Sequence, residues 1–450
     1  MIAEIPPGGL AARLAGRIAG RQALVGIVGL GYVGLPLALT ICAAGFRVLG
    51  FDIDARRVEH LNRGDSLIRH IPPEPILAAL ERGLFEATGD FERLAEPDAI
   101  LICVPTPLTK QREPDLSFVV ATGESIVRRL RPGQLVVLES STYPGTTDEV
   151  LRPILERGGL RSGTDFFLAF SPEREDPGNS LFSTHNIPKV VGGDGPQAMA
   201  LADALYGAFV TSTVPVSTPA TAEAVKLTEN IFRSVNIALA NELKVIYDAM
   251  GINVWEVIDA AKTKPFGFMP FYPGPGLGGH CIPIDPFYLT WKAREYDIAT
   301  RFIELAGQIN TAMPRYVVDR LAEALDRRFR RGLNGARVLV LGVAYKRNVD
   351  DTRESASFKL MELLEERGAA TDFHDPHVAT IPTTREHAGL AGRASVVLDA
   401  QTLAGYDAVL IATDHDQVDY SLVARHAALV VDTRNACAKA GADLARVVRA

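Results

Sequence analysis

The sequence predicts an α/β protein in which two doubly wound parallel sheets are joined by a long central helix. Short apolar runs alternate with helical patterns up to about residue 215, and again from about residue 316. Such alternation indicates parallel strands connected by helices. A glycine-rich turn follows the first apolar run at Gly29. Between the two α/β parts, a helical pattern continues to Met250 without an internal glycine or proline.

Ten apolar runs have the length and flanking turn residues of strands. In the first part they span 24–29, 47–52, 99–104, 134–139, 166–170 and 188–192. In the second part they span 337–343, 370–374, 408–412 and 428–432, with a helix expected over 354–367. The long helix begins at Thr218 or Thr221. Its apolar positions are dense, which favours burial between domains or at a subunit interface.

The segment between residues 24 and 52 has the pattern of a dinucleotide-binding unit. Its G-x-G-x-x-G sequence comes directly after an apolar run and consists of Gly29, Gly31 and Gly34. The first glycine permits the tight turn, the second lets a pyrophosphate approach, and the third lets the helix pack on the strand. A second apolar run ends at Asp52, and an acid there binds the adenosine ribose and favours NAD over NADP.

Composition favours an enzyme without nucleic-acid or membrane partners. The 450 residues suffice for two or three domains, and the net charge of −7 offers no basic surface for nucleic acid or anionic lipid. No charged residue occurs between Arg21 and Arg47, but the glycine spacing and Pro36 fit a buried βαβ unit better than a membrane span. Because no secretory signal pattern begins the chain, we expect a cytoplasmic protein. The four cysteines lack paired spacing, so neither a disulfide framework nor a metal site is indicated.

The loop 274–286 has the composition of a reactive site. It reads Gly-Pro-Gly-Leu-Gly-Gly-His-Cys-Ile-Pro-Ile-Asp-Pro, and its four glycines and three prolines leave little material for a core. A backbone with so few side chains lets a polar ligand lie against main-chain N–H groups. Asp285, four residues after Cys281, is placed to orient or activate a thiolate or a water. These neighbours favour a nucleophilic Cys281 over an inert core thiol.

Polar residues follow three of the expected strands, where ligands of open α/β sheets bind. Thr106 and Thr142 offer hydroxyls to a cofactor or a catalytic water, with ordinary turn hydroxyls as the alternative. Glu173 and Arg174 follow an apolar strand, where a charged pair is either solvated or functional. These side chains mark the expected ligand edge of the first sheet.

One face of the long helix carries a second polar group. Lys226, Asn230 and Arg233 are spaced i, i+4 and i+7 and therefore project in similar directions. An amphipathic helix shows such a stripe without any function, but here the neighbouring positions are apolar. A lysine in such surroundings suits acid/base work, and Asn230 is placed to hold a water or an oxyanion.

Together these motifs resemble the UDP-glucose/GDP-mannose dehydrogenase family. The matching stretches are 29–36, 104–107, 140–147, 171–173, 223–230, 278–286 and 345–355. They occur in order and cover the chain from residue 24 to about 435. The forms of residues 171–179 and 270–281 look like the bacterial UDP-N-acetyl-glucosamine 6-dehydrogenase branch. The UDP-N-acetyl-mannosamine and UDP-glucose branches are the near alternatives.

The resemblance implies a four-electron oxidation of the sugar C6 alcohol to a carboxylate with two NAD, for surface polysaccharide synthesis. Lys226, with a water held by Asn230 and Asp285, would take the hydroxyl proton as the first hydride leaves. Cys281 would attack the resulting aldehyde to give a thiohemiacetal, and the second hydride transfer would give a thioester.

The resemblance also implies how the thioester is hydrolysed and which residues bind. Water activated by Glu173 or Asp285 and positioned by Thr142 would release the product. The implied NAD-binding residues are Gly29, Gly31, Tyr32, Val33, Gly34, Asp52, Arg57, Thr106, Thr142 and Arg353. Those implied for the UDP-sugar are Arg174, Lys226, Asn230, Arg233, Gly278, Tyr345, Lys346 and Arg434. No metal is implied.

The resemblance further divides the chain into four segments. They are an N-terminal extension (1–20), an NAD-binding Rossmann domain (21–216), a central helical and dimerisation domain with the cysteine loop (217–315), and a C-terminal UDP-sugar-binding Rossmann-like domain (316–450). A homodimer or higher homo-oligomer is expected.

Two departures from the family pattern stand out. Many members carry a second glutamate four residues after the one matching Glu173, where this chain has Pro177. Many also place an arginine just upstream of the glycine-rich loop, but none occurs between Arg233 and Arg294. Two rival functions remain: a catalytically silent nucleotide-sugar binding protein, and a two-electron dehydrogenase that needs no thiol.

Overall fold

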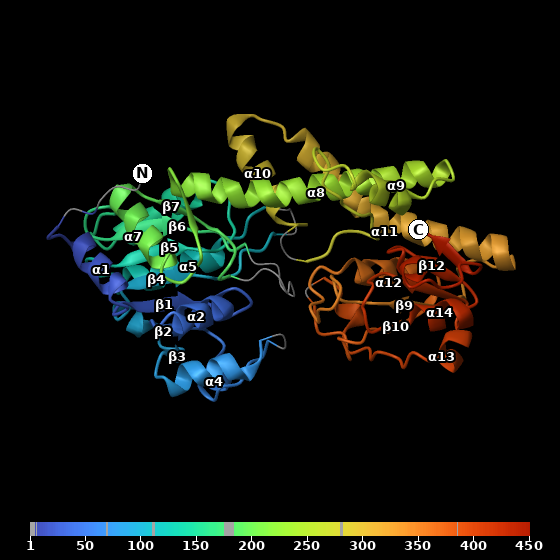
Figure 1. The fold of residues 1–450 in the computed structure, drawn as a ribbon, viewed down its shortest axis with the longest axis horizontal. Helices are drawn as coiled ribbons and strands as arrows, with labels where there is room; N and C mark the ends of the chain where they lie inside the picture. Colours follow the sequence, from blue (N-terminus) through green and yellow to red (C-terminus); the bar gives the residue numbers. More distant parts are fainter. Residues whose placement is uncertain are drawn as a thin grey trace. The chain divides into compact units, whose positions relative to one another are not determined.

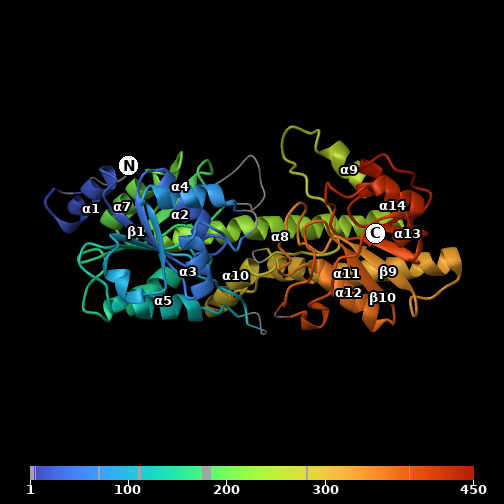
Figure 2. The same cartoon turned by 90° about the horizontal axis from the view of Figure 1, so that it is seen from below.

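The computed structural model describes residues 5, 7–68, 71–109, 113–174, 184–279, 282–384 and 386–450. Two compact units are present, coloured along the chain in Figure 1 and turned by 90° in Figure 2. Unit 1 comprises Met1–Glu229 and Phe287–Ile298, and unit 2 comprises Asn230–Pro286 and Ala299–Ala450. The helix α8 (Pro219–Ala249) contributes residues to both. The domain boundaries expected at residues 20, 216 and 315 remain predictions, because compactness does not define what a segment binds.

Unit 1 is built on an eight-stranded sheet of order β3-β2-β1-β4-β5-β6-β7-β8. The strands are β1 (Leu24–Val28), β2 (Arg47–Phe51), β3 (Phe85–Thr88), β4 (Ala99–Ile102), β5 (Leu135–Leu138), β6 (Phe167–Phe170), β7 (Lys189–Gly193) and β8 (Thr213–Val216). All neighbours pair in parallel except β6 and β7. An antiparallel pair needs no crossover helix, and the described residues between these two strands include none. The order 3-2-1-4-5-6 is that of a dinucleotide-binding sheet.

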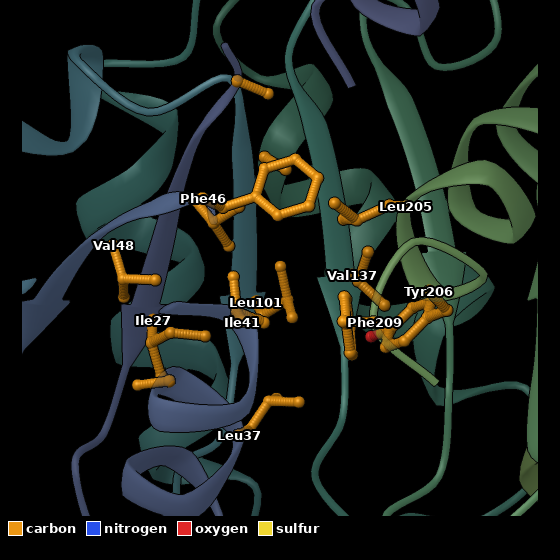
Figure 3. Packing of buried hydrophobic residues seen from close by; sticks show 14 of the residues in the cluster. Ile27, Leu37, Ile41, Phe46, Val48, Leu101, Val137, Leu205, Tyr206 and Phe209 are labelled. Carbon is orange, nitrogen blue, oxygen red and sulfur yellow. The ribbon is translucent and has the colours of Figure 1, made fainter. Parts of the chain in front are cut away.

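Helices cover both faces of this sheet. One face packs against α1 (Leu10–Ala19), α2 (Gly34–Ala43), α4 (Pro73–Glu81) and α7 (Pro196–Tyr206), and the other against α5 (Ser117–Val127) and α6 (Arg152–Glu156). Figure 3 shows the first core, where Phe46, Leu101 and Val137 lie among the side chains of α2 and α7. The N-terminal helix α1 belongs to this core through Leu14 and Ile18.

Unit 2 contains a five-stranded parallel sheet of order β10-β9-β11-β12-β13. Its strands are β9 (Arg337–Leu341), β10 (Ala370–His374), β11 (Ala408–Ile411), β12 (Val430–Asp432) and β13 (Val447–Arg449). The helices α11 (Arg301–Phe329) and α12 (Ala356–Glu366) cover one face, and α13 (Ala400–Ala404), α14 (Tyr420–His426) and α15 (Ala436–Lys439) cover the other. The predicted fold class, two doubly wound sheets, is therefore confirmed.

The remaining helical segments are short. They are α3 (Ala55–Asn62), α9 (Val254–Ala261), α10 (Asp285–Ala293), η1 (Phe91–Ala95), η2 (Thr147–Leu151), η3 (Arg294–Tyr296) and η4 (Ala388–Leu390). Within the ranges that the structure describes, no helix combines the length and apolarity needed to cross a membrane.

Each sheet has an acid directly after the strand that comes second in the chain. In unit 1, Asp52 follows β2 and its Oδ2 accepts the N–H of Leu30 at 2.9 Å. In unit 2, Asp375 follows β10 and its Oδ2 accepts the N–H of Val343 at 2.8 Å. Asp375 is also 3.1 Å from His415 Nε2, and both side chains are fully buried. The second unit thus repeats the contact between acid and turn seen in the first. In the second unit, however, the acid Asp375 also contacts His415.

Candidate active site

The three glycines of the turn after β1 have different surroundings, which show which of them serve packing and which can face a ligand. Gly29 has a φ of +93°, and a Cβ on it would lie 2.7 Å from the carbonyl oxygen of Cys103. A Cβ on Gly34 would collide with the carbonyl of Gly29. A Cβ on Gly31 would meet no atom within 4 Å. Gly29 and Gly34 are therefore required by the fold, whereas Gly31 borders open space that a ligand can enter.

Asp52 is held in one orientation beside this turn. Its side chain is 4% exposed and lies 2.8 Å from Arg57 Nη1, in addition to its bond from Leu30. Within the described part of the chain, the Nε of Arg57 has no hydrogen-bond partner. Tyr32 and Val33 lead into α2, whose N-terminus has no side-chain cap. Uncapped N–H groups suit a pyrophosphate, and a fixed acid suits a ribose, so these residues fit NAD.

Alanine substitutions at Gly31 and Gly34 are expected to have opposite effects. Gly31→Ala should fold with wild-type stability but lose NAD affinity by about 10-fold or more, because its methyl group enters the space for the pyrophosphate. Gly34→Ala should unfold more easily by about 1–3 kcal/mol, because two atoms are forced together. Thermal unfolding and NAD titration of both variants test this pair. Equal loss of stability in the two variants would contradict it.

The loop after β5 holds Thr142 in a buried position. Thr142 is 1% exposed, and its Oγ1 has no hydrogen-bond partner among the residues that the structure describes. A buried hydroxyl without a partner loses about 1–3 kcal/mol relative to a bonded one. The loop itself is fixed by Glu223 of α8, which accepts the N–H of Gly145 at 2.6 Å and that of Thr147 at 2.9 Å. Thr142 thus offers a buried hydroxyl next to a loop segment that Glu223 holds.

Glu223 predicts a pH dependence of stability. Burial raises the pKa of Glu223 to about 7, against the hydrogen bonds from Thr147 and Gly145 that favour its ionised form. Since the folded state holds the proton more tightly, the stabilisation is complete below about pH 4.5 and is lost as the pH rises through about 7. The loss amounts to roughly 3 kcal/mol. Glu223→Gln should lack this change, and denaturation of both proteins between pH 4.5 and 8 measures it. Parallel pH curves would contradict it.

Glu173 and Lys226 are brought together by the end of β6 and the first turns of α8. Lys226 Nζ donates to the carbonyl oxygen of Glu173 at 2.5 Å. The Glu173 carboxylate accepts the N–H of Arg174 on Oε1 at 2.7 Å, and its Oε2 is 3.1 Å from Lys189 Nζ. Two predicted catalytic residues therefore meet within unit 1, and a second lysine, Lys189, joins them.

Two of the cations predicted to hold UDP, Arg174 and Arg233, have different surroundings. Arg174 is paired with Glu229 at 2.5 Å and donates to the carbonyl of Pro188 at 2.6 Å. Arg233 is exposed on α8. Thr106 follows β4, and its carbonyl accepts a hydrogen bond from Tyr288 of α10. UDP binding by Arg174 would require exchange of its Glu229 contact.

In unit 2, Asn230 of α8 donates to Asp285 Oδ2 at 2.6 Å. The two residues are 4% and 2% exposed. Asp285 is the first residue of α10, and therefore its carboxylate also lies at the N-terminal end of that helix. Two predicted catalytic groups, 55 residues apart in the chain, thus form a buried pair.

Cys281 and His280 lie outside the described residues, as do Glu175, Asp176 and Pro177. The preceding glycines are described, and they pack against the segment after β9. A Cβ on Gly278 would lie 2.8 Å from the Cβ of Tyr345. The N–H of Gly279 donates to the carbonyl of Arg353 at 3.1 Å.

The start of the same loop contacts another predicted ligand residue. The N–H of Gly274 donates to Asn241 Oδ1 at 3.0 Å. A Cβ on Gly274 would lie 2.6 Å from Arg434 Nη1, so the guanidinium lies directly against the loop backbone. Lys346 adjoins Tyr345, and Arg353 pairs with Asp351 at 2.6 Å. Tyr345, Arg353 and Arg434 therefore gather around the glycine-rich loop in unit 2.

Sequence reasoning missed residues in each unit that contact the predicted site residues or their loops. They are Glu139, Lys189, Tyr206, Glu223 and Asn241. Glu139 directly follows an apolar strand, the same signal that drew attention to Glu173. Lys189 begins a strand, so that signal was absent for it. Tyr206 and Asn241 lie within regular helical patterns that carry no such sign.

Comparisons with known proteins identify the family of the chain and agree with its fold. The UDP-glucose/GDP-mannose dehydrogenase family matches with its NAD binding domain over residues 23–210, its central domain over 220–312 and its UDP binding domain over 339–439. The chain is 37% identical to a UDP-N-acetyl-D-glucosamine 6-dehydrogenase of Pseudomonas aeruginosa, covering 87% of this chain and 90% of that protein. It is 36% identical to an NDP-N-acetyl-D-galactosaminuronic acid dehydrogenase of Ralstonia nicotianae, over 91% and 95%.

A solved structure gives the same result for the fold. The UDP-D-ManNAc dehydrogenase of Pyrococcus horikoshii superimposes with a TM-score of 0.82 at 33% identity, covering 92% of this chain and 96% of that one. Sequence matches to all three domains and an NAD-binding turn of suitable geometry thus agree. The chain belongs to the UDP-glucose/GDP-mannose dehydrogenase family and is an NAD-dependent UDP-sugar 6-dehydrogenase.

Proposed function

We propose that the protein uses two NAD to oxidise the C6 alcohol of a UDP-N-acetylhexosamine to the uronate. The preferred substrate in this proposal is UDP-GlcNAc rather than one of its epimers. The relatives described above are named for N-acetylated sugars, and the one named for UDP-N-acetyl-D-glucosamine is 37% identical. UDP-ManNAc is the alternative within this class, and UDP-glucose is the alternative outside it.

The hydrogen bond between Asn230 and Asp285 carries this proposal. It ties the acid four residues beyond Cys281 to α8, one helical turn after Lys226. A buried amide–carboxylate pair is suited to hold one water, with the amide oxygen and the second carboxylate oxygen as acceptors. The chemistry of a primary alcohol needs such a water or lysine to take the hydroxyl proton.

The proposed mechanism assigns one task to each residue. NAD, which the turn around Gly31 and Asp52 would hold, would supply the hydride acceptor for both oxidations. Lys226, through the water held by Asn230 and Asp285, removes the C6 hydroxyl proton. The Cys281 thiolate bonds to the aldehyde carbon, which retains the reactive intermediate and prepares the second oxidation. Hydrolysis of the resulting thioester frees the uronate and the thiol, with Glu173 as the group that activates water.

The substrate class is tested by steady-state kinetics on UDP-GlcNAc, UDP-ManNAc, UDP-GalNAc and UDP-glucose. We expect the highest kcat/KM with UDP-GlcNAc and a value about 100-fold lower with UDP-glucose, because a site that bonds the N-acetyl group leaves its polar atoms unpaired with a hydroxyl. A higher kcat/KM for UDP-glucose would contradict the N-acetylhexosamine assignment. NADH formation from none of the four would overturn the proposed activity.

A second copy of the chain is proposed to cover one face of α8. Phe232, Leu239, Ile246 and Met250 are 47%, 50%, 46% and 63% exposed and are spaced as one apolar stripe. Exposed apolar stripes of this kind mark protein interfaces. The combined substitutions Leu239→Glu and Ile246→Glu should convert a dimer into monomers in light scattering. Val397→Glu, at a side chain 72% exposed, is the control and should leave the mass unchanged. A wild-type monomer would contradict this interface.

A further inference from the structure

A buried lysine lies behind Glu173 in unit 1. Lys189, the first residue of β7, places its ammonium 2.8 Å from Glu139 Oε2 and 3.1 Å from Glu173 Oε2. The side chains of Lys189, Glu139 and Glu173 are 3%, 0% and 13% exposed. One ammonium therefore bridges two carboxylates, and Glu173 is the carboxylate nearer to solvent.

The other end of this cluster is anchored in the hydrophobic core. Tyr206 of α7 donates its hydroxyl to Glu139 Oε1, and its ring centroid is 5.5 Å from Lys189 Nζ. Figure 3 shows Tyr206 beside Phe209 and near Val137 of β5. Tyr206, Glu139, Lys189 and Glu173 thus form one chain of contacts from the core to the edge of the sheet.

Lys189 stays charged in this cluster although burial disfavours its charge. Burial alone disfavours the ammonium of Lys189, but Glu139 and Glu173 outweigh it and hold the pKa of Lys189 above its ordinary value. Burial raises the pKa of Glu139. A buried ion pair adds little stability over apolar side chains of similar volume. Stability alone therefore does not explain the arrangement.

We infer that Lys189, held by Glu139 and Tyr206, is a positioning residue that orients the Glu173 carboxylate and keeps it ionised for thioester hydrolysis. This inference rests on the proposed thioester route. Glu173 takes a proton from water as the water oxygen bonds to the thioester carbon. The C–S bond then breaks, the departing Cys281 sulfur receives that proton, and the product acid loses its own proton to solvent.

The charges around Glu173 determine the expected pH effect. Lys226 donates to the main-chain carbonyl of Glu173, and Lys189 contacts its carboxylate. Glu139 lies on the far side of Lys189, and the buried thiol of Cys103 interacts with the same three charged groups. Removal of the Lys189 ammonium favours protonated Glu173. The acidic limb of the hydrolysis rate should then move to higher pH.

The test uses the double variant Lys189→Met/Glu139→Gln, which avoids leaving a buried Glu139 charge without its cation. Rapid-mixing measurements follow the two NADH formed per UDP-GlcNAc, and intact mass spectrometry follows the uronyl thioester on the enzyme. We expect hydride transfer at the wild-type rate, hydrolysis slowed about 10- to 100-fold and accumulated thioester. The acidic limb should move up by about one pH unit.

Three matched variants distinguish positioning from structural damage. Glu139→Gln alone weakens the hold on Lys189 but leaves its ammonium on Glu173, so it should slow hydrolysis less than the double variant does. Lys244→Met removes another buried lysine, paired with Asp248 at 2.8 Å, and should lower stability without changing the ratio of hydrolysis to hydride transfer. Tyr206→Phe should change hydrolysis and its acidic limb as the double variant does, but less, and decides the question if that variant does not fold.

Two results would overturn the inference. One is an unchanged hydrolysis rate and pH profile in the folded double variant, or in Tyr206→Phe where the double variant fails to fold. The other is an equal fall of hydride transfer and hydrolysis. Glu173→Gln separates this failure from that of the proposed function. If Glu173→Gln accumulates thioester and the double variant does not, only the role of Lys189 is lost. If Glu173→Gln hydrolyses normally, the assigned base and the inference both fail.

Discussion

Replacement of Cys281 by alanine is expected to reduce kcat/KM for uronate formation from every UDP-sugar by about 1,000-fold or more. Without the thiol the aldehyde has no covalent attachment, and the second oxidation loses its thiohemiacetal substrate. Steady-state NADH formation and analysis of released sugar measure this effect. Trace product should be an aldehyde rather than a uronate.

Cys437→Ala is the matched control, because Cys437 is a fully buried thiol in the core of unit 2. It should keep wild-type kcat/KM. A Cys281→Ala protein that retains activity within about tenfold of wild type would contradict covalent catalysis. That result would instead favour a dehydrogenase that needs no thiol.

Lys226→Met is expected to slow the first hydride transfer by about 100- to 10,000-fold, the usual size of a general-base contribution. The hydroxyl proton then has no acceptor beside α8, while the NAD-binding turn around Gly31 and Asp52 is untouched. Single-turnover NADH formation measures the step, and NAD titration shows that cofactor affinity is kept.

Lys359→Met removes an exposed lysine of α12 and serves as the control. It should leave both quantities unchanged. A Lys226→Met protein with a raised KM and normal single-turnover rate would show that Lys226 only binds substrate. That outcome would contradict its assignment as the group that takes the proton.

The NAD-binding turn could be predicted from sequence because its contacts are local. Gly29, Gly34 and Asp52 belong to one βαβ unit, and each of their contacts with that unit follows from the spacing. The buried central strands were also predictable, and β10 was predicted with its correct ends. The edge strands β3, β8 and β13 were missed because they are short, and β8 and β13 contain no fully buried residue.

Contacts between distant segments could not be predicted from pattern alone. Glu139 and Lys189 are 50 residues apart, and the β6–β7 pair that brings them together is antiparallel. Either residue read by itself is a charge at a strand end. Their pairing depends on strand order, which periodicity does not determine.

The substrate-side residues show a different limit. The shared water-holding role of Asn230 and Asp285 was taken from the family resemblance, and the structure places the two residues in a hydrogen-bonded pair. Arg174 was assigned to UDP in the same way, yet its guanidinium contacts Glu229 and Pro188. A resemblance indicates which residue occupies a position but not which neighbour it contacts before substrate binds.

The most direct test of the four-electron route is the number of NADH molecules formed for each UDP-GlcNAc consumed. Purified protein, excess NAD and a limiting amount of sugar nucleotide give this ratio from absorbance and chromatography. The proposed mechanism predicts two NADH for each uronate formed. A ratio of one, with an aldehyde as the released product, would contradict it.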